Sequence, residues 1–228
     1  MGILQRALML SEERSREILN QMEKMSLITE HEDLFTITHL GMNLLDASLD
    51  GNLEAIHRTL YHYSPYVNAF ERTKKGAVTI DELSKELGMS RVSIDILLRL
   101  IGWSTPNLVK NLQTERYYIS SNATPNEEEF RKTLYKIYKQ LSAPSFFGMS
   151  RRYIEIPIIR EYVCEKLAIS HQTFDNIFSG IANTSSEIIE LASAPRIGIE
   201  QKGKRPFYLK PGGIPYFYVH IEEPKQDD

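Results

Sequence analysis

Three cations around one glycine are the clearest chemical signal in this sequence. Lys202, Lys204 and Arg205 surround Gly203 in a polar turn between two segments of strand-like composition. Three positive charges at a hairpin tip can neutralise backbone phosphates, and a glycine lets the tip approach them closely. The alternative is a charged hairpin that only keeps the protein soluble. Weaker basic groups are Arg72, Lys74 and Lys75 beside Gly76, and the pair Arg151 and Arg152.

Residues suited to catalysis or metal binding form no recognisable pattern. His57 and His62 lie five positions apart and His31 and His39 eight, so neither pair shares one helical face with metal-ligand spacing. The sequence contains no phosphate-binding loop and no Gly-x-Gly-x-x-Gly motif. We therefore expect no enzymatic activity, no metal and no cofactor.

The single cysteine, Cys164, lies in an apolar helical stretch, which predicts a buried small hydrophobe rather than a nucleophile. One cysteine cannot form an internal disulfide, which fits a reducing compartment. No segment approaches the roughly 18 apolar residues of a membrane span. The N-terminus lacks the features of a signal peptide. We expect a cytoplasmic protein without membrane contact.

Charge is distributed unevenly along a chain whose net charge is −3 over 228 residues. Residues 1–50 hold four Lys/Arg against nine Asp/Glu, residues 51–121 hold nine against seven, and residues 122–228 hold fourteen of each. The apolar fraction of 42% and the charged fraction of 25% are those of an ordinary globular protein. Any binding to nucleic acid must therefore depend on local basic patches.

Two helices joined by a sharp turn are predicted within residues 79–103. Thr79 and Glu82 form a capping box that begins the first helix. Gly88 supplies a permissive backbone for the turn, and Ser90 caps the second helix. Their apolar faces are expected to hold Leu83 and Leu87 in the first helix and Val92, Ile94, Leu97, Leu98 and Ile101 in the second, with Arg91, Ser93 and Asp95 facing outward.

This arrangement resembles the helix-turn-helix family. Ile80, Leu83, Leu87, Met89, Ile94 and Leu97 occupy apolar positions of the family pattern, and Gly88 occupies its turn position. Ser84 stands where the family usually has alanine. A shift of 80 residues produces a second match over residues 160–181, in which Ala168 replaces the glycine and Ser170 replaces Ser90. Ala168 is compatible with a turn that does not require positive φ there.

The predicted order of helix, strand, helix, turn, helix and hairpin resembles the winged-helix family. We expect a mainly α fold with small β-hairpins (α+β) and tandem winged-helix modules: a partial module at residues 1–50, a module at 51–121, and a module with C-terminal β-strands at 122–228. A capping box at Thr124 and Glu127, with Pro125 at the first position, predicts the start of the leading helix of the last module. Residues 184–192 fit either a short helix or a strand.

The winged-helix resemblance implies that the second helix of each module enters the major groove of DNA. Carried over to this chain, the base-reading residues are Ser90, Arg91 and Ser93 in the middle module and His171, Gln172, Thr173 and Asn176 in the last. Arginine can hold guanine through two hydrogen bonds, and glutamine and asparagine can do the same for adenine. The alternative is that these side chains are the solvated face of a surface helix.

These observations predict a protein that binds double-stranded DNA, most simply a transcriptional regulator, with Lys202, Lys204 and Arg205 as a basic wing. A plasmid-type replication initiator is a related possibility. The rival function is a protein-interaction scaffold of a multi-subunit complex, which the net negative charge favours. In residues 1–50, Glu12, Glu13 and Glu17 oppose phosphate binding, and the apolar helix near residues 40–49 can pair. That segment is therefore expected to mediate homo-oligomerisation or contact with a protein partner.

Overall fold

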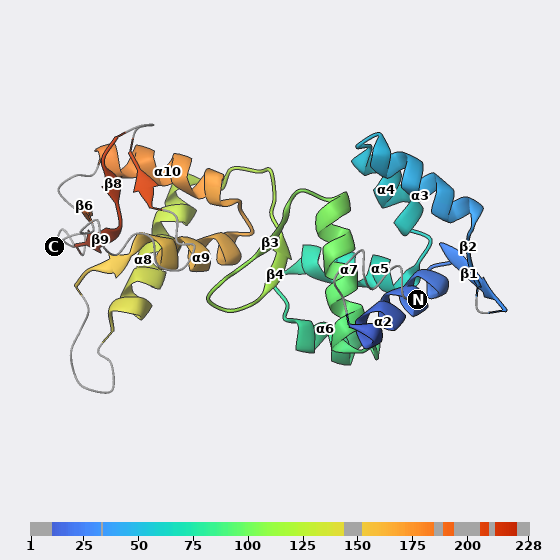
Figure 1. The fold of residues 1–228 in the computed structure, drawn as a ribbon. Coiled ribbons are helices and arrows are strands. Elements are labelled where there is room, and N and C mark those ends of the chain that lie inside the picture. Colours follow the sequence, from blue (N-terminus) through green and yellow to red (C-terminus); the bar gives the residue numbers. More distant parts are fainter. Residues whose placement is uncertain are drawn as a thin grey trace. The chain divides into compact units, whose positions relative to one another are not determined.

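The computed structural model describes residues 11–32, 34–143, 152–184, 189–193, 206–209 and 213–222. The chain forms two compact units. The first unit comprises Met1–Lys110 and Arg116–Ile119, and the second comprises Asn111–Glu115 and Ser120–Asp228. Helices predominate in the described residues and the strands form small antiparallel sheets (Figure 1), which confirms the mainly helical α+β prediction.

Six helices and two hairpins make up the described part of the first unit. The helices are α2 (Glu12–Lys24), α3 (His39–Leu49), α4 (Leu53–Leu60), α5 (Ser64–Lys75), α6 (Ile80–Leu87) and α7 (Arg91–Ser104). The strands are β1 (Ile28–His31) with β2 (Leu34–Ile37) and β3 (Leu108–Lys110) with β4 (Tyr117–Ile119). Pro65 lies in the first turn of α5, where its missing N–H costs nothing, so it separates α4 from α5.

One hydrophobic core runs through the whole first unit. Its buried residues extend from Met25 in the segment after α2 to Ile101 in α7, so the core crosses the expected module boundary near residue 50. Tyr66 is fully buried, and its hydroxyl lies 2.6 Å from Ser104 Oγ and 2.7 Å from His57 Nδ1. These contacts satisfy the one polar group of a large buried ring.

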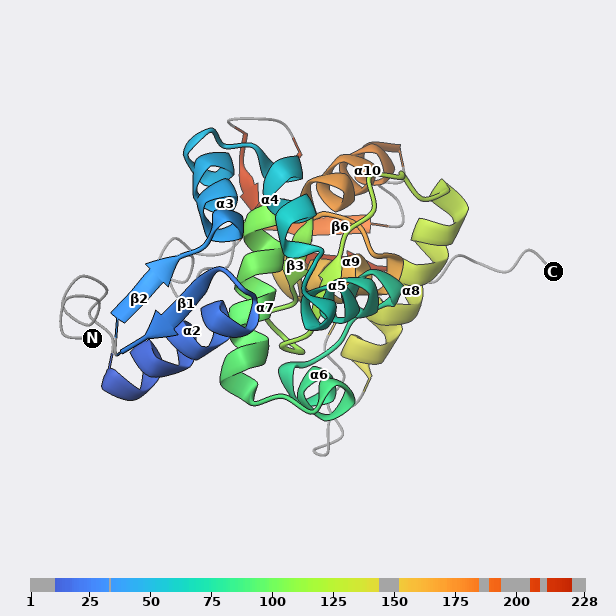
Figure 2. The ribbon, with the colours of Figure 1, turned by 90° about the vertical axis from the view of Figure 1, so that its right-hand side faces the viewer.

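The second unit contains three described helices and several short strands. The helices are α8 (Glu127–Ser142), α9 (Ile156–Leu167) and α10 (His171–Thr184), and the strands are β5 (Ile154–Glu155), β6 (Ile189–Ala192), β7 (Phe207–Tyr208), β8 (Pro215–Tyr216) and β9 (Tyr218–Ile221). Both α8 and α10 pack against α9 (Figure 2). Residues 189–192, which the sequence left open between helix and strand, form the strand β6.

Aromatic rings connect the elements of the second unit. The ring centroid of Phe174 in α10 lies 5.4 Å from that of Phe130 in α8 and 5.3 Å from that of Phe178. Phe178 in turn lies 4.9 Å from Phe207 in β7. All four side chains are buried, so this row of rings fixes the inward face of α10.

The same topology occurs once in each unit. In the second unit β5 pairs with β9 and β9 pairs with β6, so the first strand lies beside the last. In the first unit Val78 bridges to Tyr117 in β4, and β4 pairs with β3. From α5 to β4 the first unit has a helix, the isolated bridge at Val78, two helices and two strands. From α8 to β9 the second unit has a helix, a strand, two helices and the paired strands β6 and β9, with the β7–β8 pair between these two in the sequence.

Equivalent helices begin 80 residues apart, as the sequence repeat predicts. Ser90 Oγ accepts a hydrogen bond from the N–H of Ser93 (3.1 Å), and Ser170 Oγ accepts one from the N–H of Thr173 (3.0 Å). The capping box at Thr79 and Glu82 is present as well. Because both start signals depend on local residues, the sequence identifies them without knowledge of the fold.

Two local predictions are wrong. The helix α8 is capped by Asn126, whose Oδ1 accepts from the N–H of Glu128 (3.1 Å), and not by Thr124. Ala168 adopts positive φ (φ 49°, ψ 47°), the same left-handed conformation as Gly88 (φ 63°, ψ 32°). Its carbonyl oxygen accepts a hydrogen bond from the N–H of Ser121 (2.6 Å), which helps to hold the strained backbone.

None of the described helices is both long and apolar enough to cross a membrane.

The two turns provide a matched test of backbone strain. A Cβ at Gly88 meets no atom within 4 Å, so Gly88→Ala is expected to destabilise the protein by about 1 kcal/mol through φ alone. Ala168→Gly removes the same strain and is expected to stabilise by up to about 1 kcal/mol. Urea unfolding of both variants measures these changes. Effects of the same sign would contradict the equivalence of the two turns.

Candidate nucleic-acid interface

The exposed face of α10 carries a stripe of uncharged amide side chains. Gln172, Asn176 and Asn183 are exposed, and Ser179 between them is half-buried. Their spacing of four, three and four residues places them along one side of a helix. The opposite side of α10 is fixed in the core by the buried aromatic rings. The amides are therefore presented to solvent by a rigid element, in a geometry suited to hydrogen bonding with base edges.

The first turn of α10 holds two predicted reading residues in internal contacts. His171 Nε2 lies 3.3 Å from Oε1 of Glu161, whose side chain is only 8% exposed. Thr173 Oγ1 lies 2.9 Å from the capping Ser170 Oγ. Both His171 and Thr173 thus help to begin and orient the helix, whereas Gln172 and Asn176 project from it.

An ion pair between a buried arginine and a partly exposed aspartate joins α9 to α10. Arg160 Nε lies 2.9 Å from Asp175 Oδ1, and the Arg160 side chain is 4% exposed. The guanidinium carbon also lies 6.0 Å from the centroid of the Phe174 ring, within the range of a cation–π contact. Because Asp175 lies between Gln172 and Asn176 in the sequence, this pair fixes the helical segment that carries the amide stripe.

The start of α7 is held by contacts with α2. The hydroxyls of Ser90 and Ser93 donate hydrogen bonds to Oε1 of Glu17, at 2.9 and 2.8 Å. Arg14 Nη2 lies 2.6 Å from Asp95 Oδ2. Ser93 was predicted to face outward, but it is 4% exposed because α2 lies over it. The two helices of the repeat therefore differ in what they present to solvent.

The two carboxyl groups between α2 and α7 each have a lowered pKa. Hydrogen bonds from Ser93 and then Ser90 lower the pKa of Glu17. Burial works to raise the pKa of Asp95, but hydrogen bonds from Arg14 and Arg99 outweigh it and lower that pKa. Both carboxylates are thus held in the charged form that binds their partners.

Arg91 is the predicted reading residue of α7 that points away from α2. Its side chain is 70% exposed, and Nη1 lies 2.7 Å from Oδ1 of Asp81. A salt bridge at such an exposed site contributes little energy, so Asp81 does not prevent Arg91 from contacting another molecule. Arg91 nevertheless lacks an exposed polar neighbour comparable with the amide stripe of α10, because Ser93 is buried.

The tip of the β3–β4 hairpin belongs to the second unit, where it is bound to α9. Asn111 is fully buried, and its Nδ2 donates to the carbonyl oxygen of Glu161 (3.3 Å) and to the carboxylate of Glu165. The N–H of Leu112 donates to Glu161 Oε2 (3.1 Å), and Thr114 Oγ1 donates to Glu165 Oε2 (2.6 Å). The polar tip is therefore occupied by an internal contact.

The basic wing, possible metal ligands and Cys164 are the remaining residues that the sequence singled out. Lys202, Lys204 and Arg205 lie outside the described residues. Among the residues that the structure describes, no group of three or more His, Cys, Asp and Glu side chains could hold a metal ion. Cys164 is fully buried, which confirms the prediction for it, and burial raises the pKa of its thiol well above the ordinary value.

The sequence did not reveal the glutamates that accept the internal hydrogen bonds of α7 and of the β3–β4 tip. Glu17 was identified only as an opponent of phosphate, and nothing in the local sequence links it to Ser90, which lies 73 positions away. Glu161 and Glu165 were not identified at all. Asn183 could have been found, because it lies seven positions after Asn176 and therefore on the same helical side.

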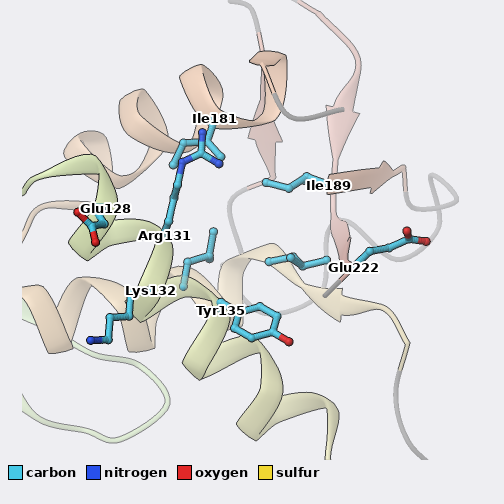
Figure 3. A pocket seen from close by; sticks show the side chains of 9 residues that line it. Glu128, Arg131, Lys132, Tyr135, Ile181, Ile189 and Glu222 are labelled. Atoms are coloured by element: carbon cyan, nitrogen blue, oxygen red, sulfur yellow. The ribbon is translucent and has the colours of Figure 1, made fainter. Parts of the chain in front are cut away.

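A cavity of about 350 Å³ lies beside α8 and α10 (Figure 3). Leu134, Ile181, Ile189 and Ile221 give it apolar walls, and Arg131 and Lys132 stand at its edge. Figure 3 shows the Glu222 carboxylate pointing away from the space that Ile189 faces. Its apolar walls suit an apolar group, and Glu128, Tyr135 and Glu222 are among the polar residues that also line it.

Searches with the sequence and the structure found no matching family model, no matching curated protein and no matching solved structure.

The contact between α2 and α7 predicts a specific loss of stability. Glu17→Ala removes the acceptor of two hydroxyl groups and is expected to cost about 1 kcal/mol at neutral pH, since the site is partly exposed. Because the folded-state pKa of Glu17 is lowered, its contribution is complete above its ordinary pKa of 4.5 and disappears as the pH falls through the lowered value.

Urea unfolding at pH 7 and near pH 3 measures this effect. Glu23→Ala, at an exposed position of the same helix, is the matched control and should change stability by less than about 0.5 kcal/mol. Equal stability of Glu17→Ala and Glu23→Ala at pH 7 would count against the contact.

Proposed function

We propose that this chain binds double-stranded DNA sequence-specifically and is built from winged-helix modules. In this proposal α10 is the helix that contacts the base edges. The observation that carries the proposal is the exposed amide stripe of Gln172, Asn176 and Asn183 on the second helix of a helix-turn-helix. A transcriptional regulator is the simplest role for such a protein, and a replication initiator would use the same contact with DNA.

The topology of the second unit supports the winged-helix assignment. Its helix, strand, helix, turn, helix and hairpin follow the order of that family, and β5 pairs with the last strand β9. The first unit repeats the order from α5 to β4. Residues 1–50 contribute a helix, a hairpin and α3, which corresponds to the latter part of such a module.

The chemistry of α10 favours adenine-containing sites. The amide N–H of glutamine or asparagine can donate to N7 of adenine while the amide oxygen accepts from the N6 amino group, and the major groove exposes both atoms. An uncharged stripe also avoids the sequence-independent attraction that lysine and arginine would add at the same positions. Phosphate binding then requires cations elsewhere, and Lys202, Lys204 and Arg205 supply the best set in the sequence.

The second candidate function is a protein-interaction scaffold in the cytoplasm. An exposed apolar groove in the first unit favours it, because solvent-exposed apolar surface commonly marks a protein contact. The two functions need not exclude each other, since the groove and α10 belong to different units.

Selection from a random duplex library, followed by fluorescence anisotropy on the selected site, tests the proposal. Gln172→Ala/Asn176→Ala is expected to weaken binding to that site by about 1–3 kcal/mol while non-specific binding and the salt slope stay nearly unchanged. Lys202→Ala/Lys204→Ala/Arg205→Ala is expected to weaken all duplexes alike and to reduce the salt slope by about one unit per lost phosphate contact.

A matched control is Asn20→Ala/Gln140→Ala, which removes two exposed amides from α2 and α8. This control should bind the selected duplex as the unmodified protein does, and circular dichroism should show all variants folded. Failure of the library to yield any preferred site, or equal affinity of the α10 variant and the control, would refute the reading role of α10.

A further inference from the structure

An apolar groove crosses the first unit between α2, α3 and α7. Its volume is about 330 Å³, and its lining contains no charged side chain. The lining residues are Ile18, Gln21, Met22, Met25, Leu27, Ile37, Gly41, Leu44, Leu45, Ser48, Ile96, Leu100 and Trp103. A groove of this composition is favourable for another apolar surface and unfavourable for nucleic acid.

The apolar surface continues from the groove over the ridge of α3. Leu45 lines the groove, and Met42 and Leu49 follow it round the helix at spacings of three and four residues. Leu49 is 77% exposed and Leu45 is 44% exposed. Meanwhile Gly41, Leu44 and Ala47 form the buried face of the same helix. Thus α3 is apolar on two sides, whereas a surface helix needs only one apolar side.

Close packing of α3 on the hairpin exposes this ridge. A Cβ at Gly41 would lie 2.1 Å from the carbonyl oxygen of Leu27 and 2.7 Å from Cγ1 of Ile37. The glycine therefore allows α3 to lie against the β1–β2 region, with Leu45 and Leu49 left on the solvent side. The groove and the ridge are rigid neighbours on one surface.

We propose that this surface joins two copies of the chain in a two-fold symmetric dimer. A two-fold contact requires a self-complementary surface, and here a projecting ridge lies beside a receiving groove, so the ridge of each copy can enter the groove of the other. The proposal does not depend on the DNA-binding function. A second copy of the chain is the partner, because the same surface carries both the ridge and the groove.

The exposed area is sufficient for such a contact. Ile37, Met42, Leu45, Leu49 and Trp103 are 43%, 42%, 44%, 77% and 39% exposed. With about 200 Å² for each fully exposed side chain of this size, they leave about 500 Å² per copy. Covering them on both copies buries about 1,000 Å², the size at which specific interfaces begin.

Light scattering on the full chain at about 1 to 200 µM tests the proposal. The unmodified protein should approach twice the chain mass of 26.3 kDa as its concentration rises. Leu49→Glu should remain a monomer, because the contact would have to bury an unpaired carboxylate. The variant should still fold, since Leu49 is exposed and its replacement leaves the core intact. Ile214→Glu, at a 65% exposed position in the second unit, is the matched control and should dimerise normally.

Trp103, the only tryptophan in the chain, reports whether the groove is the contact. Its quenching by acrylamide should decrease with rising concentration in the unmodified protein and stay constant in Leu49→Glu. A monomer at every concentration would overturn the proposal, whatever the quenching of Trp103. A dimer that Leu49→Glu leaves intact, or in which Trp103 stays fully quenchable, would overturn it as well.

Discussion

The contact of one carboxylate with two hydroxyl groups distinguishes the two equivalent helices of this protein. Glu17 accepts hydrogen bonds from Ser90 and Ser93, and Arg14 pairs with Asp95 one turn further along α7. At the equivalent positions of α10, Ser170 and Thr173 bond to each other and Asp175 pairs with Arg160 of the neighbouring helix. The cap hydroxyls of α7 are thus bound to another helix, whereas those of α10 bond to each other, and Gln172 and Asn176 beside them are exposed.

This difference explains how a chain of net negative charge can present an apolar groove in one unit and an uncharged polar helical face in the other. In the first unit the acidic α2 lies on α7, and together with α3 it borders an apolar groove. In the second unit the buried aromatic rings hold α10 from within, so that its outer face needs no further partner for stability. The proposed protein contact and the proposed base reading therefore fall on different units.

Local signals in the sequence predicted much of the fold. The capping box at Thr79 and the cap at Ser90 depend on neighbouring residues, and the structure confirms both. The cap of α8 was misassigned to Thr124 because Asn126, two positions later, offers the same chemistry. Ala168 was misjudged since the support for its positive φ comes from Ser121, a residue distant in the sequence.

The candidate site could be predicted only in part, for a similar reason. Gln172 and Asn176 follow from the helical repeat, which sequence spacing contains. The burial of Ser93 and the capture of Asn111 by Glu165 depend on contacts across 76 and 54 positions, which no local pattern encodes. Periodicity locates a helical face, but tertiary contacts decide whether that face is open.

Hydrogen–deuterium exchange with and without the selected DNA duplex shows which of the two equivalent helices contacts DNA. DNA should slow amide exchange in residues 170–184 and leave exchange in residues 90–104 unchanged, because the amide stripe is exposed on α10 whereas α2 holds the start of α7. Slowed exchange in residues 90–104 without any change in residues 170–184 would contradict the proposed contact of α10 with DNA.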